Sequence, residues 1–154
     1  MIKHYLFDWG DTLMVDLPNQ TGPMCDWPKI QVVAGAKNCL KRLSRNAQCH
    51  LATNAEDSSE VQIRHALIRA GLSEFITQVF CRENLGLSKT DTGYYLKIVQ
   101  QLGASPSQVS MLGDSLEKDV LAPMAAGLKS VWFNPTNQKS SQNILMVEQL
   151  SEFV

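Results

Sequence analysis

Two carboxylates lie directly after a short apolar segment near the start of the chain. Residues 4–7 read His-Tyr-Leu-Phe, and the residues that follow include Asp8, Gly10, Asp11 and Thr12. The segment has the length of one buried strand. Carboxylates at the end of a buried strand are costly unless a cation, hydrogen-bond donors or water compensate their charge. We therefore expect the two aspartates to form part of a site that later segments complete.

Later polar residues fall at equivalent positions. Thr53 and Asp114 each follow a short apolar segment, and Lys89 lies in a loop before a segment with helical spacing. In an open α/β sheet the carboxyl ends of the strands lie at one edge, where ligands bind. We therefore expect these three residues to converge on Asp8.

This set of residues favours phosphoryl transfer assisted by a divalent cation. Converging carboxylates repel each other unless a cation bridges them, and oxygen ligands without a nearby His or Cys favour Mg²⁺ over zinc. One carboxylate could act as a nucleophile and form an aspartyl phosphate. Mg²⁺ and Lys89 would neutralise the transferring oxygens, and Thr53 would donate a hydrogen bond to them. The residues therefore predict a Mg²⁺-dependent phosphohydrolase.

Strands and helices are expected to alternate along the chain. The strand-like segments are residues 4–7, 49–52, 78–81, 108–112 and 130–133. The helical patterns are residues 33–46 and the segments that end at Ala70, Gln101 and Ala126. This alternation predicts a doubly wound, Rossmann-like α/β fold, with a mainly parallel sheet and helices on both faces. A chain of 154 residues is expected to form a single domain, 1–154.

Short polar residues are the expected helix caps. Asp57 or Ser58 is expected to cap the second helix, and Asp91 or Thr92 the third. The weakly apolar tail, 143–154, is expected to form a short strand followed by a helical turn.

The segment 14–30 is interpreted as a flap over the end of the sheet. It is rich in turn-forming residues, but it also contains bulky side chains such as Trp27, and it is too short for a separate domain. Trp27 is expected either to pack the flap onto the domain or to stack on a substrate.

Composition and charge exclude several classes of function. The formal net charge of −1 gives no general attraction to nucleic acid or to an anionic membrane. No apolar run approaches the length of a membrane span, and no signal peptide is evident. The four cysteines form no Cys-x-x-Cys pair and are expected to be buried free thiols in a reducing compartment. We therefore expect a cytoplasmic protein.

Four segments resemble, in order, the motifs of the haloacid dehalogenase-type (HAD) phosphohydrolase superfamily. They are residues 7–13, residues 51–54, Lys89 before its helix, and residues 113–119. Each motif alone is a weak signal, but four in the right order, each at the end of the right element, form a strong one. The resemblance covers nearly the whole chain and implies a HAD-type fold.

The resemblance also implies a role for each residue. Asp8 would be the nucleophile and a Mg²⁺ ligand, together with the backbone carbonyl of Gly10 and the side chain of Asp114. Phosphoryl oxygens would be bound by Thr53, Asn54 and Lys89. The residues expected to surround and orient these groups are Thr12, Ser115 and Asp119, of which Asp119 would hold a metal-bound water or Lys89.

Position 10 departs from the family pattern. Phosphatases of the family usually read Asp-x-Asp-Gly-Thr, and the second Asp is the general acid/base. Here that position is Gly10, and the acid lies one residue later, at Asp11. A positioned acid or base contributes roughly 10²–10⁴-fold to the rate.

Three interpretations of this departure stay open. The turn could be remodelled so that Asp11 reaches the leaving group, because glycine is conformationally permissive. The substrate could have a leaving group that needs no acid. Alternatively, the protein could bind a phosphorylated ligand as a regulatory protein with little turnover.

The resemblance further implies an open site. Caps in the family are inserted just after the first motif or between the second and third. Here the first gap holds only the flap, and the second holds only one helix and one strand. We expect the flap, or a neighbouring copy in a homo-oligomer, to cover the site. The expected substrate is a phosphorylated small molecule or a larger phosphoester.

Overall fold

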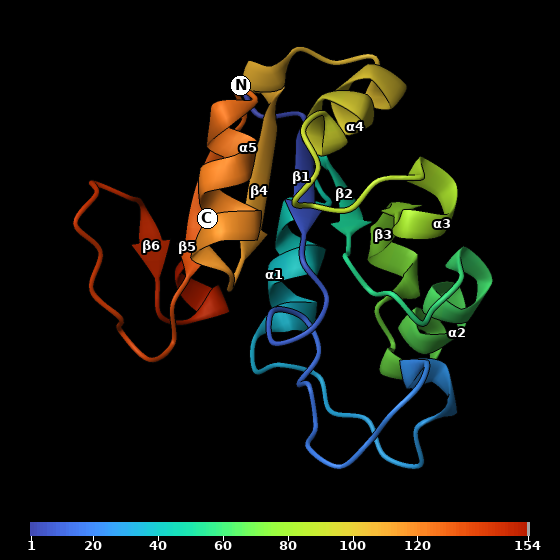
Figure 1. Cartoon of the computed structure of the whole chain (residues 1–154). Coiled ribbons are helices and arrows are strands. Elements are labelled where there is room, and N and C mark those ends of the chain that lie inside the picture. The colour runs from blue at the N-terminus through green and yellow to red at the C-terminus, as the bar shows by residue number, and fades with distance from the viewer. Residues whose placement is uncertain (154) are drawn as a thin grey trace.

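The computed structural model describes residues 1–153 and contains one six-stranded sheet in the order β3-β2-β1-β4-β5-β6 (Figure 1). Every neighbouring pair of strands is parallel. The strands are β1 His4–Phe7, β2 Gln48–Ala52, β3 Ile76–Phe80, β4 Val109–Gly113, β5 Lys129–Phe133 and β6 Met146–Val147. The predicted doubly wound sheet is therefore confirmed.

Helices cover both faces of the sheet, as predicted. The helices are α1 Ala36–Leu43, α2 Glu60–Ala70, α3 Arg82–Leu85, α4 Tyr94–Leu102 and α5 Ala122–Ala125. Successive side chains of a strand point to opposite faces. Phe7 of β1 accordingly packs with α1 and α2, whereas Leu6 packs with α4 and the ends of α5. Both side chains are fully buried, which explains why the central strand reads as a continuous apolar run.

Two helix starts differ from the prediction because local contacts compete with the helix. Helix α1 begins at Ala36 rather than at residue 33, because the Val33 N–H donates to the carbonyl of Leu13 and Gly35 adopts a left-handed conformation (φ 83°). Helix α2 is capped by Ser59, not by Asp57 or Ser58. Ser59 forms a reciprocal capping box with Gln62.

The third and fourth helices also differ from those predicted. Helix α4 begins at Tyr94 after Gly93, and the Asp91 carboxylate instead accepts the Ser88 N–H within the preceding loop. The pattern that ends at Ala126 is divided into a π-helical stretch, Leu116–Leu121, and helix α5. The tail follows the prediction, with β6 and a 3₁₀ turn at Leu150–Glu152.

The segment 14–30 packs against α2. Met14 is bridged to Val32, which brings the two ends of the segment together. Arg69 of α2 donates to the carbonyls of Met24, Cys25 and Trp27, the last at 2.7 Å. The Trp27 side chain is 7% exposed, and it therefore packs the flap in place while one edge lines the pocket described below.

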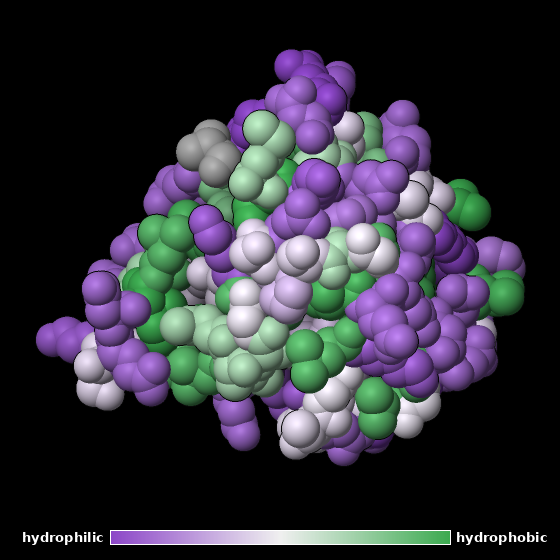
Figure 2. Space-filling view, turned by 90° about the horizontal axis from the view of Figure 1, so that it is seen from above, coloured by the Kyte–Doolittle hydropathy of each residue, from purple (hydrophilic) through white to green (hydrophobic). Residues whose placement is uncertain are grey.

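The opposite edge of the molecule, at the amino ends of the strands, has a mixed surface. Figure 2 shows this face from above, with hydrophobic side chains interspersed among hydrophilic ones. Within the described part of the chain, no helix combines the length and the hydropathy that a membrane span requires. All four cysteines are free thiols, and Cys39, Cys49 and Cys81 are buried.

Candidate active site

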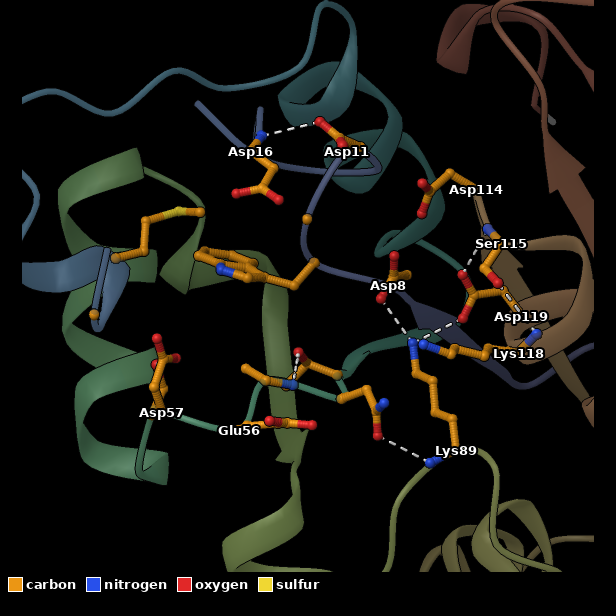
Figure 3. Close-up of a pocket in the computed structure, with 18 of the residues that line it drawn as sticks. Asp8, Asp11, Asp16, Glu56, Asp57, Lys89, Asp114, Ser115, Lys118 and Asp119 are labelled. Atoms are coloured by element: carbon orange, nitrogen blue, oxygen red, sulfur yellow. Dashed lines mark hydrogen bonds and ion pairs between the residues drawn. The ribbon is translucent and has the colours of Figure 1, made fainter. Parts of the chain in front are cut away.

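A pocket of about 480 Å³ lies where the central strands end (Figure 3). The pocket lies at the carboxyl ends of β1, β2 and β4, which share one edge of the parallel sheet. The predicted site residues that line it are Asp8, Gly10, Asp11, Thr53, Asn54, Lys89, Asp114, Ser115 and Asp119. Segments far apart in the sequence therefore meet in one cavity.

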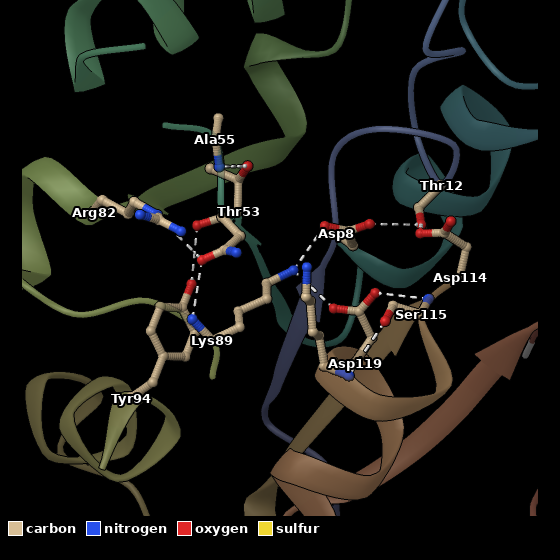
Figure 4. Close-up of polar contacts among 12 residues, drawn as sticks. Asp8, Thr12, Thr53, Ala55, Arg82, Lys89, Tyr94, Asp114, Ser115 and Asp119 are labelled. Atoms are coloured by element: carbon tan, nitrogen blue, oxygen red, sulfur yellow. Dashed lines mark hydrogen bonds and ion pairs between the residues drawn. The ribbon is translucent and has the colours of Figure 1, made fainter. Parts of the chain in front are cut away.

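Lys89 joins two of the motifs through a buried ammonium group. Its Nζ lies 2.7 Å from Asp8 Oδ1 and 2.7 Å from Asp119 Oδ1, and its side chain is only 1% exposed (Figure 4). Burial alone would lower the pKa of Lys89, but the two carboxylates outweigh it and raise that pKa well above its usual value. Lys89 is therefore a fixed positive charge in the inner part of the pocket.

Asp8 is kept ionised by these contacts. Burial would raise the pKa of its carboxyl group, but the Lys89 charge and several hydrogen bonds lower it. Its side chain retains 14% exposure to the pocket. An ionised and accessible carboxylate at this position has the properties of a nucleophile.

The Thr12 hydroxyl lies between the carboxylates of Asp8 and Asp114. Its hydroxyl oxygen lies 3.2 Å from Asp8 Oδ2 and 3.2 Å from Asp114 Oδ1. One hydroxyl has a single proton and can donate it to only one carboxylate at a time. Burial, followed by the hydrogen bond and charge of Asp8, raises the pKa of Asp114 to about 8. Near neutral pH the arrangement therefore favours either a proton on Asp114 or a cation beside the two carboxylates.

Asp119 is held from two sides. Its Oδ1 accepts from Lys89, and its Oδ2 accepts the Ser115 N–H at 3.0 Å. A Cβ on Gly113 would lie 2.3 Å from Asp119 Cγ, so the close approach requires glycine at position 113. Burial and the charge of Asp8 raise the pKa of Asp119 to about 6, despite the opposing effect of Lys89.

The carboxylates provide a suitable donor set for a hard divalent cation. Ligand oxygens of Asp8, Asp114 and Asp119 lie within 4.8 Å of one another. Both oxygens of Asp119 are already engaged by protein donors, whereas Asp8 and Asp114 lie on either side of the Thr12 hydroxyl, which can donate to only one of them at a time. Oxygen donors with excess negative charge fit Mg²⁺, and Asp8 and Asp114 are the residues placed to hold it.

The opposite wall carries the residues expected to contact a phosphoryl group. The Thr53 hydroxyl accepts the Ala55 N–H at 3.1 Å, which leaves its own proton available for donation. Tyr94 donates to the Thr53 carbonyl at 3.2 Å and fixes the end of β2. Asn54 Oδ1 accepts the backbone N–H of Lys89 at 3.0 Å, so the second motif positions the third.

Asp11 lines the pocket but does not turn toward Asp8. Its backbone is left-handed (φ 57°), and its exposed carboxylate accepts the Asp16 N–H at 2.9 Å (Figure 3). Asp11 therefore anchors the start of the flap. Its predicted part in proton transfer is not supported by a contact in this arrangement.

Several pocket residues were not anticipated. Lys118 is half-buried and extends into the pocket toward Lys89 (Figure 3). The π-helical winding of Leu116–Leu121 changes which side chains share a face, and an α-helical pattern could not reveal this. The outer wall also includes Trp9 of the first motif segment, together with Asp16, Met24, Glu56 and Asp57, which lie outside the four motif segments.

Comparison with known proteins agrees with this geometry. The family model described as haloacid dehalogenase-like hydrolase matches residues 11–127. The pyrimidine 5′-nucleotidase PynA of Streptococcus pneumoniae is 35% identical over 107 residues, which cover 68% of this chain and 44% of PynA. The chain spans less than half the length of this and another curated relative.

Solved structures show the same fold. An uncharacterized protein from Listeria monocytogenes serotype 4b superimposes with a TM-score of 0.86 at 20% identity, covering 99% of this chain and 94% of that one. The HAD-hydrolase YfnB of Bacillus subtilis, solved bound to magnesium, gives 0.79 at 17% identity, with 98% and 96% covered. The family match spans most of the sequence and includes the last three motif segments in full and the first in part. The chain belongs to the haloacid dehalogenase-like hydrolase family.

Proposed function

We propose that the chain is a Mg²⁺-dependent phosphomonoester hydrolase that acts through a phosphorylated Asp8. The observation that carries the proposal is the contact network at Asp8. A buried lysine holds this carboxylate ionised, and the Thr12 hydroxyl lies between it and a second carboxylate, Asp114. The network therefore combines a nucleophile with a position for a cation.

The chemistry assigned to Asp8 has two steps. One carboxylate oxygen attacks the phosphorus, the bond from phosphorus to the leaving oxygen breaks, and Asp8 carries the phosphoryl group. A water oxygen then attacks the phosphorus, the bond to Asp8 breaks, and inorganic phosphate leaves. Phosphoryl transfer of this kind depends mainly on positioning and charge neutralisation.

The surrounding residues stabilise the transferred group. The Lys89 ammonium and the Thr53 hydroxyl lie on the pocket wall and would donate to phosphoryl oxygens. Asp8, Asp114 and the Gly10 carbonyl would hold Mg²⁺, which when bound neutralises negative charge on the phosphoryl oxygens. Asp119 would keep Lys89 oriented, and the Ser115 N–H would hold Asp119 in place. The Thr12 hydroxyl would orient Asp8 or Asp114.

The proposed substrates are phosphorylated small molecules or larger phosphoesters. The pocket is open on its outer side, where the flap provides the described cover. We also propose that a second copy of the chain completes the cover of the pocket. A nucleotidase among the relatives supports the phosphomonoester class without fixing the leaving group.

The test is hydrolysis of 4-nitrophenyl phosphate by the wild-type chain and by Asp8→Asn. We expect turnover that requires both Mg²⁺ and Asp8, with a phosphorylated protein trapped by rapid acid quench. A panel of alkyl and aryl phosphates that gives no turnover dependent on Asp8 would contradict the proposal.

A second candidate is a phospholigand-binding protein with little turnover. It is favoured by the absence of a carboxylate at Gly10 and by the engagement of Asp11 with the flap. For this candidate we expect inorganic phosphate or a phosphate ester to bind with Mg²⁺ but to give no phosphorylated Asp8 in the acid-quench experiment.

A further inference from the structure

A flap carboxylate lies beside the place where residue 10 lacks a side chain. A Cβ built on Gly10 has Asp16 Cβ as its neighbour at 4.0 Å, and no closer heavy atom apart from those of the adjoining residues. Asp16 and Gly10 line the same pocket as Asp8. The turn therefore brings Asp16 next to Gly10, although the two residues are six positions apart in the sequence. The Asp16 side chain begins beside the space that a side chain at position 10 would enter.

The turn that carries Asp16 is fixed at several points. The Asp16 N–H donates to Asp11 Oδ1 at 2.9 Å, and the left-handed backbone of Asp11 directs its carboxylate there. Met14 donates to the Trp9 carbonyl at 3.0 Å, and Val15 donates to the Gln31 carbonyl at 2.8 Å. The backbone of Asp16 is thus held in place before any substrate enters.

The Asp16 carboxylate itself is free to act. Among residues 1–153, no side chain or backbone group forms a hydrogen bond or ion pair with its oxygens. Figure 3 shows this side chain extending from the flap into the pocket, while the Asp11 carboxylate is turned toward the Asp16 backbone. The two acids therefore have different environments: the Asp11 carboxylate accepts a backbone N–H, and the Asp16 carboxylate has no hydrogen-bond or ion-pair partner within the described residues.

We propose that Asp16 is the general acid/base of the reaction and that Asp11 is the positioning residue that holds it. This inference rests on the proposed phosphohydrolase function. In the first step, protonated Asp16 gives its proton to the leaving oxygen as the phosphorus–oxygen bond breaks. In the second, the Asp16 carboxylate takes a proton from the attacking water, and the bond between phosphorus and Asp8 breaks. Asp16 ends the cycle protonated, as it began.

The leaving group provides the test. We would measure kcat/KM, which reports on steps up to the first irreversible one, with 4-nitrophenyl phosphate and with ethyl phosphate. Ethoxide needs a proton to leave, whereas 4-nitrophenolate does not. We expect Asp16→Asn to lower kcat/KM for ethyl phosphate by about 10²–10⁴-fold, and by less than about tenfold for 4-nitrophenyl phosphate. The same variant should show a burst of 4-nitrophenolate, because the second step also loses its base.

Substitutions at Asp11 separate the anchor from the acid. Asn at position 11 retains a carbonyl oxygen that can accept the Asp16 N–H, whereas Ala does not. We expect Asp11→Asn to lower kcat/KM for ethyl phosphate by no more than about tenfold, and Asp11→Ala to lower it further. A larger loss in Asp11→Asn than in Asp16→Asn would overturn the assignment and make Asp11 the acid.

A rescue and a matched control complete the experiment. An aspartate in place of Gly10 fits the space beside Asp16, so the double variant Gly10→Asp/Asp16→Asn should recover activity on ethyl phosphate relative to Asp16→Asn. Asp26→Asn removes the same charge from an exposed flap residue outside the pocket and should match the wild type.

The outcomes distinguish this inference from the function on which it rests. If the wild type shows no turnover that depends on Asp8, both are wrong. If turnover depends on Asp8 but Asp16→Asn affects the two substrates equally, the hydrolase function stands and the role of Asp16 is overturned.

Discussion

The inner and outer halves of the pocket are built differently. The inner half, defined by Asp8, Lys89, Asp114 and Asp119, is buried or half-buried and connected through side-chain contacts. The outer half, defined by Asp11, Asp16, Glu56 and Asp57, is exposed, and its contacts include the bond from the Asp16 N–H to the Asp11 carboxylate. Packing therefore fixes the part that would act on a phosphoryl group, while the part that would meet a leaving group lies on surface segments.

The two halves also differ in energetics. Lys89 is buried with two carboxylates, and removal of one partner from a buried ion pair is strongly destabilising, at about 3–5 kcal/mol. Glu56 pairs with Arg82 at 3.1 Å, but both side chains are exposed, and such a pair contributes about 0–1 kcal/mol. Changes in the inner half should therefore affect both folding and chemistry, whereas changes in the outer half should affect chemistry alone.

The largest expected effect is at Asp8. Asp8→Asn replaces the proposed nucleophile by a neutral amide, so kcat should fall by about 10⁴-fold or more, as for other lost nucleophiles. Rapid-quench labelling with a radioactive phosphate ester should detect no phosphorylated protein. Asp57→Asn is the outer-half comparison. An equal loss of kcat in both variants would remove the distinction between the halves.

The next effect is structural and concerns two glycines. Gly113→Ala places a Cβ 2.3 Å from Asp119 Cγ, so Asp119 must move away from Ser115 and Lys89. We expect the free energy of unfolding to fall by at least about 1–3 kcal/mol, the usual range for overpacking. Gly10→Ala, where the nearest such atom is 4.0 Å away, should change it by less than about 0.5 kcal/mol. Urea unfolding measures the free energy of unfolding of both variants. Similar losses of stability in the two would contradict the packing described around Gly113.

Magnesium and pH should act together on the inner half. Asp114 has an ordinary pKa of 3.8 and a folded-state value of about 8, so between these values the folded protein binds a proton that the unfolded chain releases. The metal-free protein should therefore lose stability as pH rises from about 4 to about 8. The proposed Mg²⁺ would replace that proton, so its stabilising effect should grow over the same range.

Thermal unfolding with and without Mg²⁺ at pH 6 and pH 8 measures this linkage. At a Mg²⁺ concentration 100 times Kd, the expected stabilisation is about 2.7 kcal/mol. Asp114→Asn should be more stable than the metal-free wild type at pH 8 and should gain little from Mg²⁺. A metal-free wild-type protein whose stability rises between pH 6 and pH 8 would contradict the proton sharing between Asp8 and Asp114.

The smallest effect is expected at the flap anchor. Arg69→Ala removes the donor to the carbonyls of Met24, Cys25 and Trp27, so stability should fall by about 1 kcal/mol and KM should rise several-fold. Arg64→Ala on the same helix removes donors to Ile76 and Thr77 instead. Hydrogen exchange in residues 14–30 should accelerate only in Arg69→Ala. Equal acceleration in both would mean that Arg69 is not a specific anchor.

Two residues of the inner half, Asp8 and Asp114, could be predicted from the sequence because they follow strands. A buried strand such as β1 is recognisable from its apolar run, and the carboxyl ends of parallel strands must share an edge. Asp8, Thr53 and Asp114 could therefore be brought together without knowledge of the strand order. The family resemblance added Asn54, Ser115 and Asp119, which line the same cavity.

The outer half could not be predicted because it depends on turns and long-range contacts. The left-handed conformation of Asp11 turns its carboxylate to Asp16, and nothing in the residue types specifies that choice. Arg69 holds the flap from more than 40 residues away. Lys118 was not anticipated in the pocket, because a pattern with an α-helical period does not indicate the π-helical winding of Leu116–Leu121.

The anchored flap changes the thermodynamics of ligand capture. Its contacts with α2 form when the chain folds, so the loss of conformational entropy belongs to folding and not to association. We expect a ligand that enters such a preorganised pocket to require no gating motion of this segment. We therefore expect the rate of entry to depend on diffusion and on the local electric field, and selectivity between ligands to appear mainly in their dissociation rates.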